Sequence, residues 1–431
     1  MLQKLFGFDP AKHNVKTEIM AGLTTFLTMA YILAVNPNIF SNLAGMGMPT
    51  DAVFTATALA AIIGTLVMSI YAKKPFALAP GLGLNAFFVF TVCLTMGYSW
   101  QFALTAILIE GIIFVILTLT NVREAIVNAI PNTLKNAIGA GIGLFIAFIG
   151  LENAGIIVNS DATLVTLDIT SNSALLCVIG LIITGVMVIM KVKGAILFGI
   201  ILTAIIGVPM GLTSFNGIVS QAPSIAPIFC QFEWNHIFTL DMVIVVFTFL
   251  FIDMFDTIGT VVGVSKKANM MNPDGSIPGI NRILMADAVA TVAGACVGTS
   301  TTTTYVESAS GVSVGGRTGL TSFTVAVCFI IALFFSPIFL AIPGSATAPA
   351  LIIVGLMMLT PIKDIDLDDF SESIPAYITL IMMPLAYSIS DGIMLGMISY
   401  VVLNAICGKF KKISVTLWIL AILFVLRYIF L

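Results

Sequence analysis

The chain has 431 residues, of which 59% are hydrophobic and 9% are charged, and its formal net charge at pH 7 is −3. A soluble domain carries about 25% charged residues, so this chain lacks the polar side chains needed to cover a water-exposed surface. The composition therefore excludes an ordinary soluble protein and indicates a polytopic α-helical membrane protein.

The chain starts with a polar stretch that ends near Glu18 and has no signal-peptide pattern, so the first apolar segment is expected to remain as a span. A full span needs about 20 apolar residues, or fewer where the helix is broken or shielded by protein. The first seven predicted spans are 17–36, 52–72, 82–96, 100–120, 133–151, 173–190 and 194–210. The next seven are 241–263, 282–297, 304–314, 318–336, 345–360, 372–388 and 389–407, and a last apolar segment covers 413–430.

Positive charge follows every second span when the amino terminus is placed inside. The residues concerned are Lys4, Lys12, Lys16, Lys73, Lys74, Arg123, Lys135, Lys191, Lys193, Lys266 to Arg282, Arg317, Lys363 and Lys409 to Lys412. This positive-inside pattern predicts fourteen spans through residue 407, in the cell inner (plasma) membrane, with a cytoplasmic amino terminus. Beyond residue 372, either 413–430 is a fifteenth span, or 372–407 is a re-entrant hairpin and 413–430 is the last helix.

Two successive sets of seven spans must lie in opposite orientations, which is the inverted-repeat arrangement of many secondary transporters. The third segment of each set is irregular: Pro80, Gly81 and Gly83 disfavour helix in the first, and four consecutive threonines, 301–304, favour extended backbone in the second. Extended backbone at membrane depth requires protein or a water-filled cavity around it. We predict that both stretches meet near the midplane and lead into half-helices that offer a site for a polar ligand. The alternative is that both are exposed loops.

Six acidic residues fall inside predicted spans beyond their first two residues, although a carboxylate at the bilayer centre costs about 3 kcal/mol. They are Glu110, Asp253, Asp256, Asp287, Glu307 and Asp391. Asp253 and Asp256 are spaced i, i+3 and share a helix face. Apart from Arg282 at the first residue of its span, no Lys, Arg or His lies in the predicted spans that carry these acids, so the acids must be hydrogen-bonded, protonated or facing a ligand. Asp256 and Glu307 are the strongest functional candidates and Asp253 follows; Glu110 and Asp287 are expected to bridge helices, and Asp391 to cap the helix that starts at 392.

Other classes of protein find little support in the sequence. The six cysteines are scattered singly, so we expect no disulfide, metal site or cofactor. No phosphate-binding Gly-x-x-x-x-Gly-Lys-Ser/Thr loop is present, and both histidines lie in polar connections, which argues against ATP-driven transport and against serine or zinc proteases. An aspartyl intramembrane protease would need Asp after Gly81-Leu-Gly83, where this chain has Leu84. A channel would need no paired acids on one helix face.

Several strings in these segments closely resemble the azaguanine-type purine permeases of the nucleobase–cation symporter (nucleobase–ascorbate transporter) superfamily. The matching strings are Ala21–Pro37, Ala79–Ala86, Phe251–Thr260, Thr299–Gly319 and Met382–Gly392. The resemblance implies fourteen segments in two inverted sevens. It further implies a core domain of 1–121 and 240–337, a gate domain of 131–212 and 344–431, and a homodimer.

The resemblance also assigns roles in the site. Asp256 and Glu307 would bind a purine base, with Asn85 and Asp253 as further polar groups. Tyr305 and Val306 would contribute main-chain groups. A carboxylate can accept two N–H bonds in one plane and a protonated carboxyl can donate, so Asp256 and Glu307 are also the predicted proton-coupling residues.

The leading hypothesis is thus a proton-coupled importer of guanine and hypoxanthine that contacts the lipid bilayer and no nucleic acid. The alternatives are an adenine-preferring permease, a uracil or xanthine carrier on the same fold and, more distantly, an intramembrane enzyme.

Overall fold

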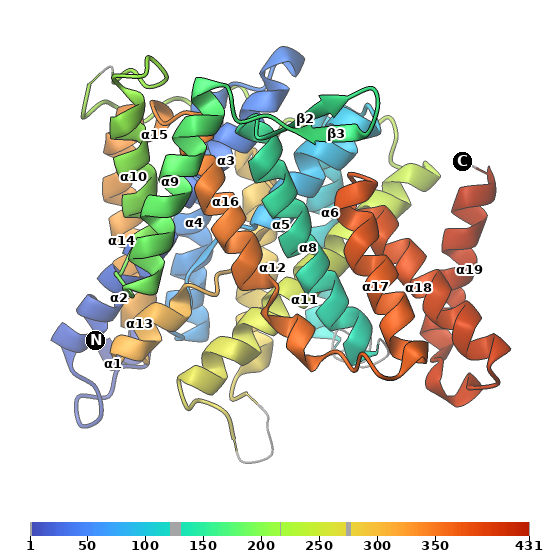
Figure 1. Cartoon of the computed structure of the whole chain (residues 1–431). Coiled ribbons are helices and arrows are strands. Elements are labelled where there is room, and N and C mark those ends of the chain that lie inside the picture. The colour runs from blue at the N-terminus through green and yellow to red at the C-terminus, as the bar shows by residue number, and fades with distance from the viewer. Residues whose placement is uncertain (1, 121–130, 216, 273–276, 431) are drawn as a thin grey trace. The chain divides into compact units, whose positions relative to one another are not determined.

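The computed structural model describes residues 2–120, 131–215, 217–272 and 277–430, and most of them are helical (Figure 1). Ten helical stretches among these residues are long and apolar enough to cross a membrane, and four shorter apolar helices accompany them. The predicted polytopic helical fold is therefore confirmed, while the number of membrane crossings stays a prediction. Arg123, one of the basic residues used to predict the orientation, lies outside the described residues.

The first predicted span is broken, because α2 (Val15–Met29) ends before Tyr31 and α3 (Ile32–Phe40) starts after it. The Asn14 side chain caps α2 by accepting hydrogen bonds from main-chain N–H groups. The first half continues with α4 (Thr50–Val67), β1 (Leu78–Pro80), α5 (Leu82–Ala86), α6 (Trp100–Leu119), α8 (Asn132–Asn153), α9 (Asn172–Ile189) and α10 (Ala195–Gly207). Its smaller elements are α1 (Leu2–Phe6), the hairpin of β2 (Ile157–Ser160) and β3 (Leu164–Leu167), and π-helical stretches at Met68–Ala72 and Phe87–Thr95.

The second half begins with the long helix α11 (Leu240–Lys267). It continues with α12 (Ile280–Val297), β4 (Thr302–Thr304), α13 (Ser308–Val314), α14 (Gly319–Ala332), α15 (Ser336–Leu340), α16 (Gly344–Met358), α17 (Phe370–Leu385), α18 (Ile389–Ile406) and α19 (Val415–Phe430). The predicted spans thus coincide with helices, and both predicted extended stretches contain a short strand.

Equivalent elements of the two halves make equivalent contacts. β1 and β4 pair with each other, and α4 and α12 also pack together. Around this pair, α14 packs on α4 in the way that α6 packs on α12. Likewise α2 contacts α13 and α14, while α11 contacts α5 and α6. Such an exchange of neighbours is the pattern expected of two repeats with inverted topology.

The chain forms two compact units, of which the larger contains Met1–Leu119 and Gly150–Ala350. The smaller unit contains Thr120–Ile149 and Leu351–Leu431. All of the segments predicted to form the core domain that are described lie in the larger unit, together with α9 and α10. The division into core and gate domains stays a prediction.

The smaller unit contains a hairpin in which α17 and α18 pack along each other. At its open end, Lys412 Nζ donates hydrogen bonds to Asp369 Oδ2 (3.1 Å) and Glu372 Oε1 (3.0 Å). The hydrogen bond from Ser371, and then that from Lys412, hold the pKa of the Asp369 carboxyl below its ordinary value. The two ends of the hairpin therefore lie together. This is compatible both with two full spans at 372–388 and 389–407 and with a re-entrant hairpin over 372–407.

The expected cap of α18 is wrong. Asp391 was predicted to cap a helix starting at residue 392, but α18 starts at Ile389 and Ser388 is its N-cap. The Ser388 side chain accepts a hydrogen bond from the Asp391 N–H (3.2 Å). The Asp391 carboxylate instead accepts a hydrogen bond from the Tyr428 hydroxyl (2.7 Å). Ser at an N-cap satisfies the same free N–H groups as Asp, so Ser388 can cap the helix three residues before Asp391.

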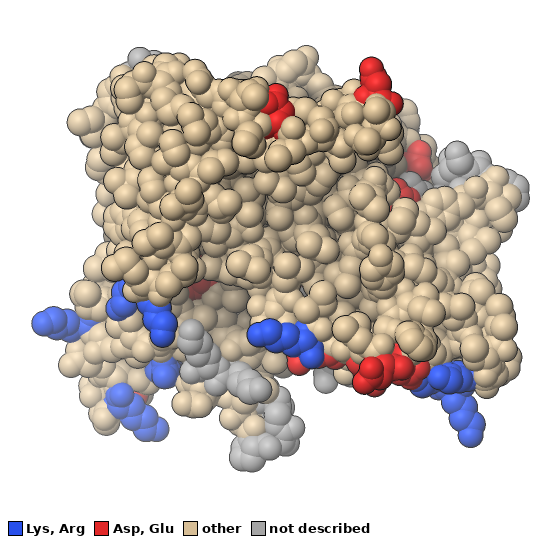
Figure 2. Space-filling model, viewed as in Figure 1, with Lys and Arg blue, Asp and Glu red and all other residues tan. Residues whose placement is uncertain are grey.

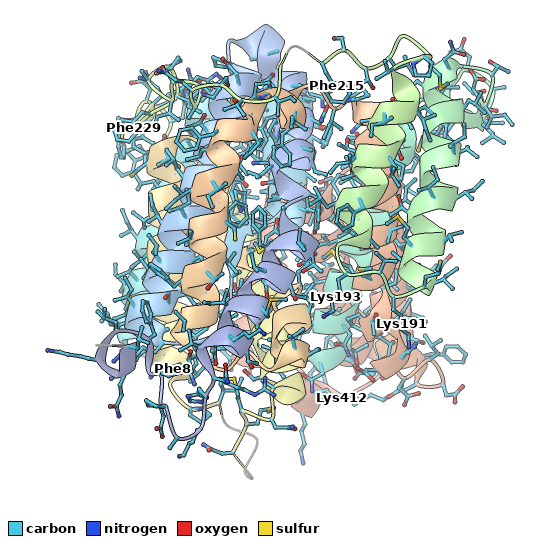
Figure 3. All side chains as sticks on the ribbon, turned by 90° about the vertical axis from the view of Figure 1, so that its left-hand side faces the viewer. Phe8, Lys191, Lys193, Phe215, Phe229 and Lys412 are labelled. Carbon is cyan, nitrogen blue, oxygen red and sulfur yellow. The ribbon has the colours of Figure 1, made fainter. Side chains whose placement is uncertain are left out.

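Basic side chains gather at one end of the larger unit, whereas aromatic side chains lie at both ends. Figure 2 shows its visible blue side chains near the end where α1 and α2 begin, and red ones at the opposite end. In Figure 3, Phe8, Lys191 and Lys193 lie toward the first end, whereas Phe215 and Phe229 lie toward the other. Phe215 and Phe229 are exposed, at 43% and 49%. This distribution agrees with the charge pattern from which the orientation was predicted.

Candidate functional site

The two interrupted segments meet through an antiparallel pair of strands in the larger unit. Leu78, Ala79 and Pro80 of β1 lie opposite Thr304, Thr303 and Thr302 of β4. The ladder is extended at both ends, by hydrogen bonds from Gly81 N to Thr301 O (3.0 Å) and from Tyr305 N to Ala77 O (2.9 Å). Each strand thus satisfies the main-chain groups of the other, which is how extended backbone is tolerated inside a membrane protein.

Threonines in β4 and just before it anchor the strand to the surrounding helices. Thr301 Oγ1 donates to Glu110 Oε2 of α6 (2.8 Å). Thr304 donates to Asp287 Oδ1 of α12 through its N–H (3.1 Å) and its hydroxyl (3.3 Å). Glu110 and Asp287 are both fully buried. They bridge the helices to β4, as expected of the two acids with a structural role.

Asp253 lies behind the strand pair rather than on an exposed surface. Its side chain is fully buried, and Asp253 Oδ1 lies 3.1 Å from the Thr257 hydroxyl on the next turn of α11. The same hydroxyl lies 2.9 Å from Asp287 Oδ2 and 2.7 Å from Thr303 Oγ1. Asp253 is therefore part of a buried polar cluster.

Asp256 lies beside the start of the first half-helix. A Cβ atom added at Gly81 would stand 3.7 Å from Asp256 Oδ2 and 2.9 Å from Thr303 Cγ2. Asp256 is half-buried, in contrast to Asp253 three residues earlier. The absence of a side chain at Gly81 lets the strand backbone approach this carboxylate closely. Asp256 consequently faces the junction between β1 and α5.

Glu307 lies at the beginning of α13 and is hydrogen-bonded by a residue that the sequence analysis missed. Tyr31 Oη donates to Glu307 Oε1 (2.7 Å), because the break between α2 and α3 turns Tyr31 toward the interrupted segment. Glu307 also lies within electrostatic range of Asp256. The two acids predicted to bind a ligand are thus brought together.

The residues preceding Glu307 differ in exposure. Tyr305 is 6% exposed, its N–H is taken up by the strand ladder, and its hydroxyl donates to Pro80 O (2.5 Å). Val306 is 53% exposed, which is unusual for an apolar side chain next to a buried strand pair. The exposed side of this junction is therefore formed by Val306 together with half-buried Asp256 and Glu307.

Asn85 occupies the matching half-helix, α5, and is fully buried. Its Oδ1 accepts a hydrogen bond from the Ser300 hydroxyl, and its Nδ2 has no protein partner. A buried amide N–H without a partner costs free energy unless a ligand or water accepts from it. A second polar residue of this region, Asn36 of α3, donates to Thr57 Oγ1 (2.7 Å) and Thr299 Oγ1 (3.2 Å). The sequence analysis did not single out Asn36, although a polar residue followed by Pro37 inside an apolar span could have indicated it.

The two aromatic residues that follow Asn85 pack against other rings. Phe87 makes an edge contact with Phe249, with ring centroids 4.8 Å apart, and Phe88 packs on Phe40 at 5.0 Å. Both side chains are almost fully buried. They consolidate the half-helix, and the polar edge of the site is left to Asn85, Asp256 and Glu307.

This arrangement can bind a flat, neutral, polar molecule. Two carboxyl groups accept N–H donors in their planes, or donate when protonated, while Asn85 Nδ2 offers one donor. Apart from Arg282 near the start of α12, residues 241–265 and 280–316 contain no Lys, Arg or His that would neutralise the acids. A ligand with several N–H groups would therefore match the site better than an anion.

Comparison with known proteins places the chain in a family. A model described as "Permease family" matches residues 16–421. A putative permease of Methanocaldococcus jannaschii is 49% identical over 100% of this chain and 98% of its own length. The guanine/hypoxanthine permease PbuG of Bacillus subtilis is 45% identical over 100% of both chains. The adenine permease AdeP of Escherichia coli is 41% identical over 100% of this chain and 96% of its own.

The solved structures share the fold at low sequence identity. The transmembrane domain of the cyanobacterial bicarbonate transporter BicA matches with a TM-score of 0.66 at 14% identity, covering 89% of this chain and 97% of BicA's domain. Murine Slc26a9 in its inward-facing state matches with a TM-score of 0.67 at 12% identity, covering 93% of this chain and 70% of that protein. The 7+7 inverted-repeat architecture is thus that of known membrane transporters.

Fold and site together define a multi-pass membrane transporter with two interrupted segments at its centre. The chain belongs to this permease family, within the nucleobase–cation symporter (nucleobase–ascorbate transporter) superfamily.

Proposed function

We propose that the chain is a secondary active transporter that imports purine nucleobases by proton symport. The base is held between segments 3, 8 and 10, and the site opens alternately to the two sides of the membrane. The observation that carries this proposal is the junction where the half-buried residues Asp256 and Glu307 lie beside the paired strands. Relatives named as guanine/hypoxanthine and adenine permeases, matching over the whole chain, support the substrate class.

The residues proposed to bind the base come from the three segments. Asp256 and Glu307 bond its polar edge, and Asn85 Nδ2 donates to a ring nitrogen or carbonyl. Tyr305 holds the strand pair in register through its hydroxyl, and Val306 offers an apolar surface and main-chain groups to the ring. Asp253 supports this surface from behind.

Proton coupling is proposed because acids dominate the site. A carboxyl that donates to the bound base is protonated in the loaded site, and it releases that proton together with the base before the empty, deprotonated site returns, so base and proton move together. Asp256 and Glu307 are the acids that face the base and are therefore proposed proton-coupling residues. No metal or cofactor enters this proposal.

The membrane location and orientation of the transporter are proposed from the distribution of its basic residues. We propose that it spans the inner (plasma) membrane with its amino terminus in the cytoplasm, because the basic connections lie on that side. The core domain would carry the base past the gate domain, through which two chains would form a homodimer.

Guanine and hypoxanthine are the proposed substrates, and adenine is the second candidate. The relatives bearing the two names are 45% and 41% identical to this chain, a small difference between otherwise equally complete matches. Guanine and hypoxanthine carry a ring N–H beside a carbonyl, which pairs with a carboxylate and an amide donor such as Asn85. Adenine has an exocyclic amine in place of that carbonyl.

Uptake of radiolabelled hypoxanthine tests the proposal in cells that lack their own purine permeases. Unlabelled guanine, adenine, xanthine and uracil serve as competitors, with and without a protonophore. We expect uptake that guanine blocks and that the protonophore collapses. Dominant competition by adenine would select the second candidate, and no uptake of any base by protein present at the membrane would overturn the proposal.

A further inference from the structure

A second polar cluster lies behind the strand pair, away from the surface proposed to bind the base. Its centre is the Thr257 hydroxyl oxygen, which lies within 3.1 Å of three other side-chain oxygens. They belong to Asp253 of the same helix, Asp287 of α12 and Thr303 of β4. Three of these four residues are fully buried and Thr303 is 1% exposed. Two carboxyl groups are thus joined by one hydroxyl inside the protein.

The hydrogens in this cluster can be counted. A threonine hydroxyl has one hydrogen to donate, so Thr257 can donate to one of its two carboxyl neighbours and not to both. The other short carboxyl contact is a hydrogen bond only when that carboxyl carries a proton and donates it to the Thr257 oxygen. One proton shared between Asp253 and Asp287 would make both short contacts hydrogen bonds.

The surroundings decide which acid carries the proton. Asp287 Oδ1 accepts hydrogen bonds from the Thr304 N–H (3.1 Å) and hydroxyl (3.3 Å), while its Oδ2 is 2.9 Å from the Thr257 hydroxyl. Hydrogen bonds donated to a carboxyl favour its ionised form. These donors favour the ionised form at Asp287, so Asp253 is the acid of the pair to which the proton is assigned.

Other charged groups near the cluster are also acidic. Asp256 lies one turn away on α11 and within electrostatic range of both Asp287 and Glu307. Glu110 of α6 bonds Thr301 at the beginning of the same threonine run. Loss of the Asp253 proton would therefore place one more negative charge among acids in a buried site, which is unfavourable.

We propose that Asp253 is a proton-binding site of the symporter, with Thr257 and Asp287 as the groups that transmit its occupancy to β4. Asp253 binds one proton from water on the outer side when the site opens, and it releases that proton inside. The link to the base runs through Thr257 and Asp287 to the Thr304 main chain, and from there to Glu307 three residues on. This inference rests on the proposed function, and it adds a proton site that does not touch the base.

The Asp253→Asn variant in liposomes tests this site, because an amide mimics a protonated carboxyl that cannot be deprotonated. Two assays use radiolabelled hypoxanthine: exchange of internal for external base, and accumulation driven by an imposed pH gradient. We expect exchange to stay within about threefold of wild type while accumulation falls at least tenfold. We also expect wild-type affinity for hypoxanthine to fall as the pH rises, and the affinity of the variant to depend less on pH, because only the proposed proton-coupling residues Asp256 and Glu307 remain.

Gradient-driven accumulation by Asp253→Asn equal to wild type would overturn the inference, and so would loss of exchange by folded variant protein. Thr257→Val and Thr257→Ser provide a second test that leaves both acids in place. The valine removes the bridging hydroxyl at nearly equal volume, and we expect it to reduce accumulation relative to exchange, whereas serine should restore it. Full coupling in Thr257→Val would contradict the relay.

Failure of the proposed function looks different. If the wild-type protein exchanged no base at all, the transport proposal itself would fall. If the wild type showed proton-coupled transport of the base, but the Asp253 and Thr257 variants behaved like wild type, the transport proposal would stand and the proton site alone would be wrong.

Discussion

The two interrupted segments have similar backbones and different side chains. β1 carries Leu78, Ala79 and Pro80, so that strand contributes mainly main-chain groups and apolar surface. β4 carries three threonines, of which Thr303 contacts the Thr257 hydroxyl of α11 and Thr304 donates to Asp287 of α12, while Thr301 just before the strand donates to Glu110 of α6. The half-helix after β1 presents neutral Asn85, whereas the one after β4 begins at the acid Glu307.

This difference shows that an inverted repeat can keep its backbone symmetry while its chemistry becomes one-sided. Segment 3 provides shape and close backbone approach, and segment 10 with α11 and α12 provides the ionisable groups. Equivalent positions in the two halves should therefore respond unequally to mutation, and the following predictions test that inequality.

The largest effect is expected at the half-buried acids of segment 10 and α11. Glu307→Gln and Asp256→Asn should each reduce hypoxanthine uptake by about 10- to 100-fold or more, because a hydrogen bond to a charged group contributes about 1.5–3 kcal/mol. Uptake is measured at matched amounts of membrane-inserted protein. Wild-type uptake by either variant would remove that residue from the site.

The next effect concerns the close approach of the two strands. Gly81→Ala would place a methyl group 2.9 Å from both Leu84 Cδ1 and Thr303 Cγ2, so these two side chains or β1 itself must shift. Overpacking of this kind costs about 1–3 kcal/mol, and we expect roughly tenfold weaker base binding. The matched control is Gly259→Ala on α11, where an added Cβ meets nothing within 4 Å. Equal behaviour of the two variants would refute the role given to Gly81.

A smaller effect is expected for the neutral group of segment 3. Asn85→Ala removes a donor that has no protein partner, and a neutral hydrogen bond contributes about 0.5–1.5 kcal/mol, or roughly two- to tenfold in half-saturation. Ser300→Ala removes the donor to Asn85 Oδ1 but leaves Nδ2 in place, and should have the milder effect. A loss as severe as that of Glu307→Gln would show that the two segments contribute equally.

The smallest effect lies outside both segments, in the α17–α18 hairpin. The folded-state pKa of Asp369 is depressed, so its stabilising contribution is present above its ordinary pKa and is lost as the pH falls below that value toward the folded-state pKa. The wild-type melting temperature in detergent should therefore drop more on acidification than that of Asp369→Asn. Base affinity should be unchanged in the variant at neutral pH. Identical acid profiles would show that the Ser371 and Lys412 contacts do not stabilise the hairpin.

Much of the fold could be predicted because its signals are local. Apolar length located the helices, and the threonine run and the Pro80–Gly81 pair located the two extended stretches. The short strands form where the sequence disfavours helix, and their pairing satisfies the backbone as the membrane requires.

The site was predicted less completely because its contacts link distant parts of the chain. The break at Tyr31 has no proline or glycine beside it, so no local sequence feature predicts the hydrogen bond from Tyr31 to Glu307. The spacing of Asp253 and Asp256 put both on one helix face, but it could not show that one is fully buried and the other half-buried. That distinction depends on where β4 crosses α11, which is a property of the tertiary structure.

The most direct test of the account measures base and proton in the same experiment. Purified protein is reconstituted into liposomes that contain a pH-sensitive dye, and hypoxanthine is added outside at equal pH on both sides. We predict that the interior acidifies as radiolabelled base enters, and that Glu307→Gln shows neither signal. Entry of base without acidification would contradict the central claim that this site moves a purine and a proton together.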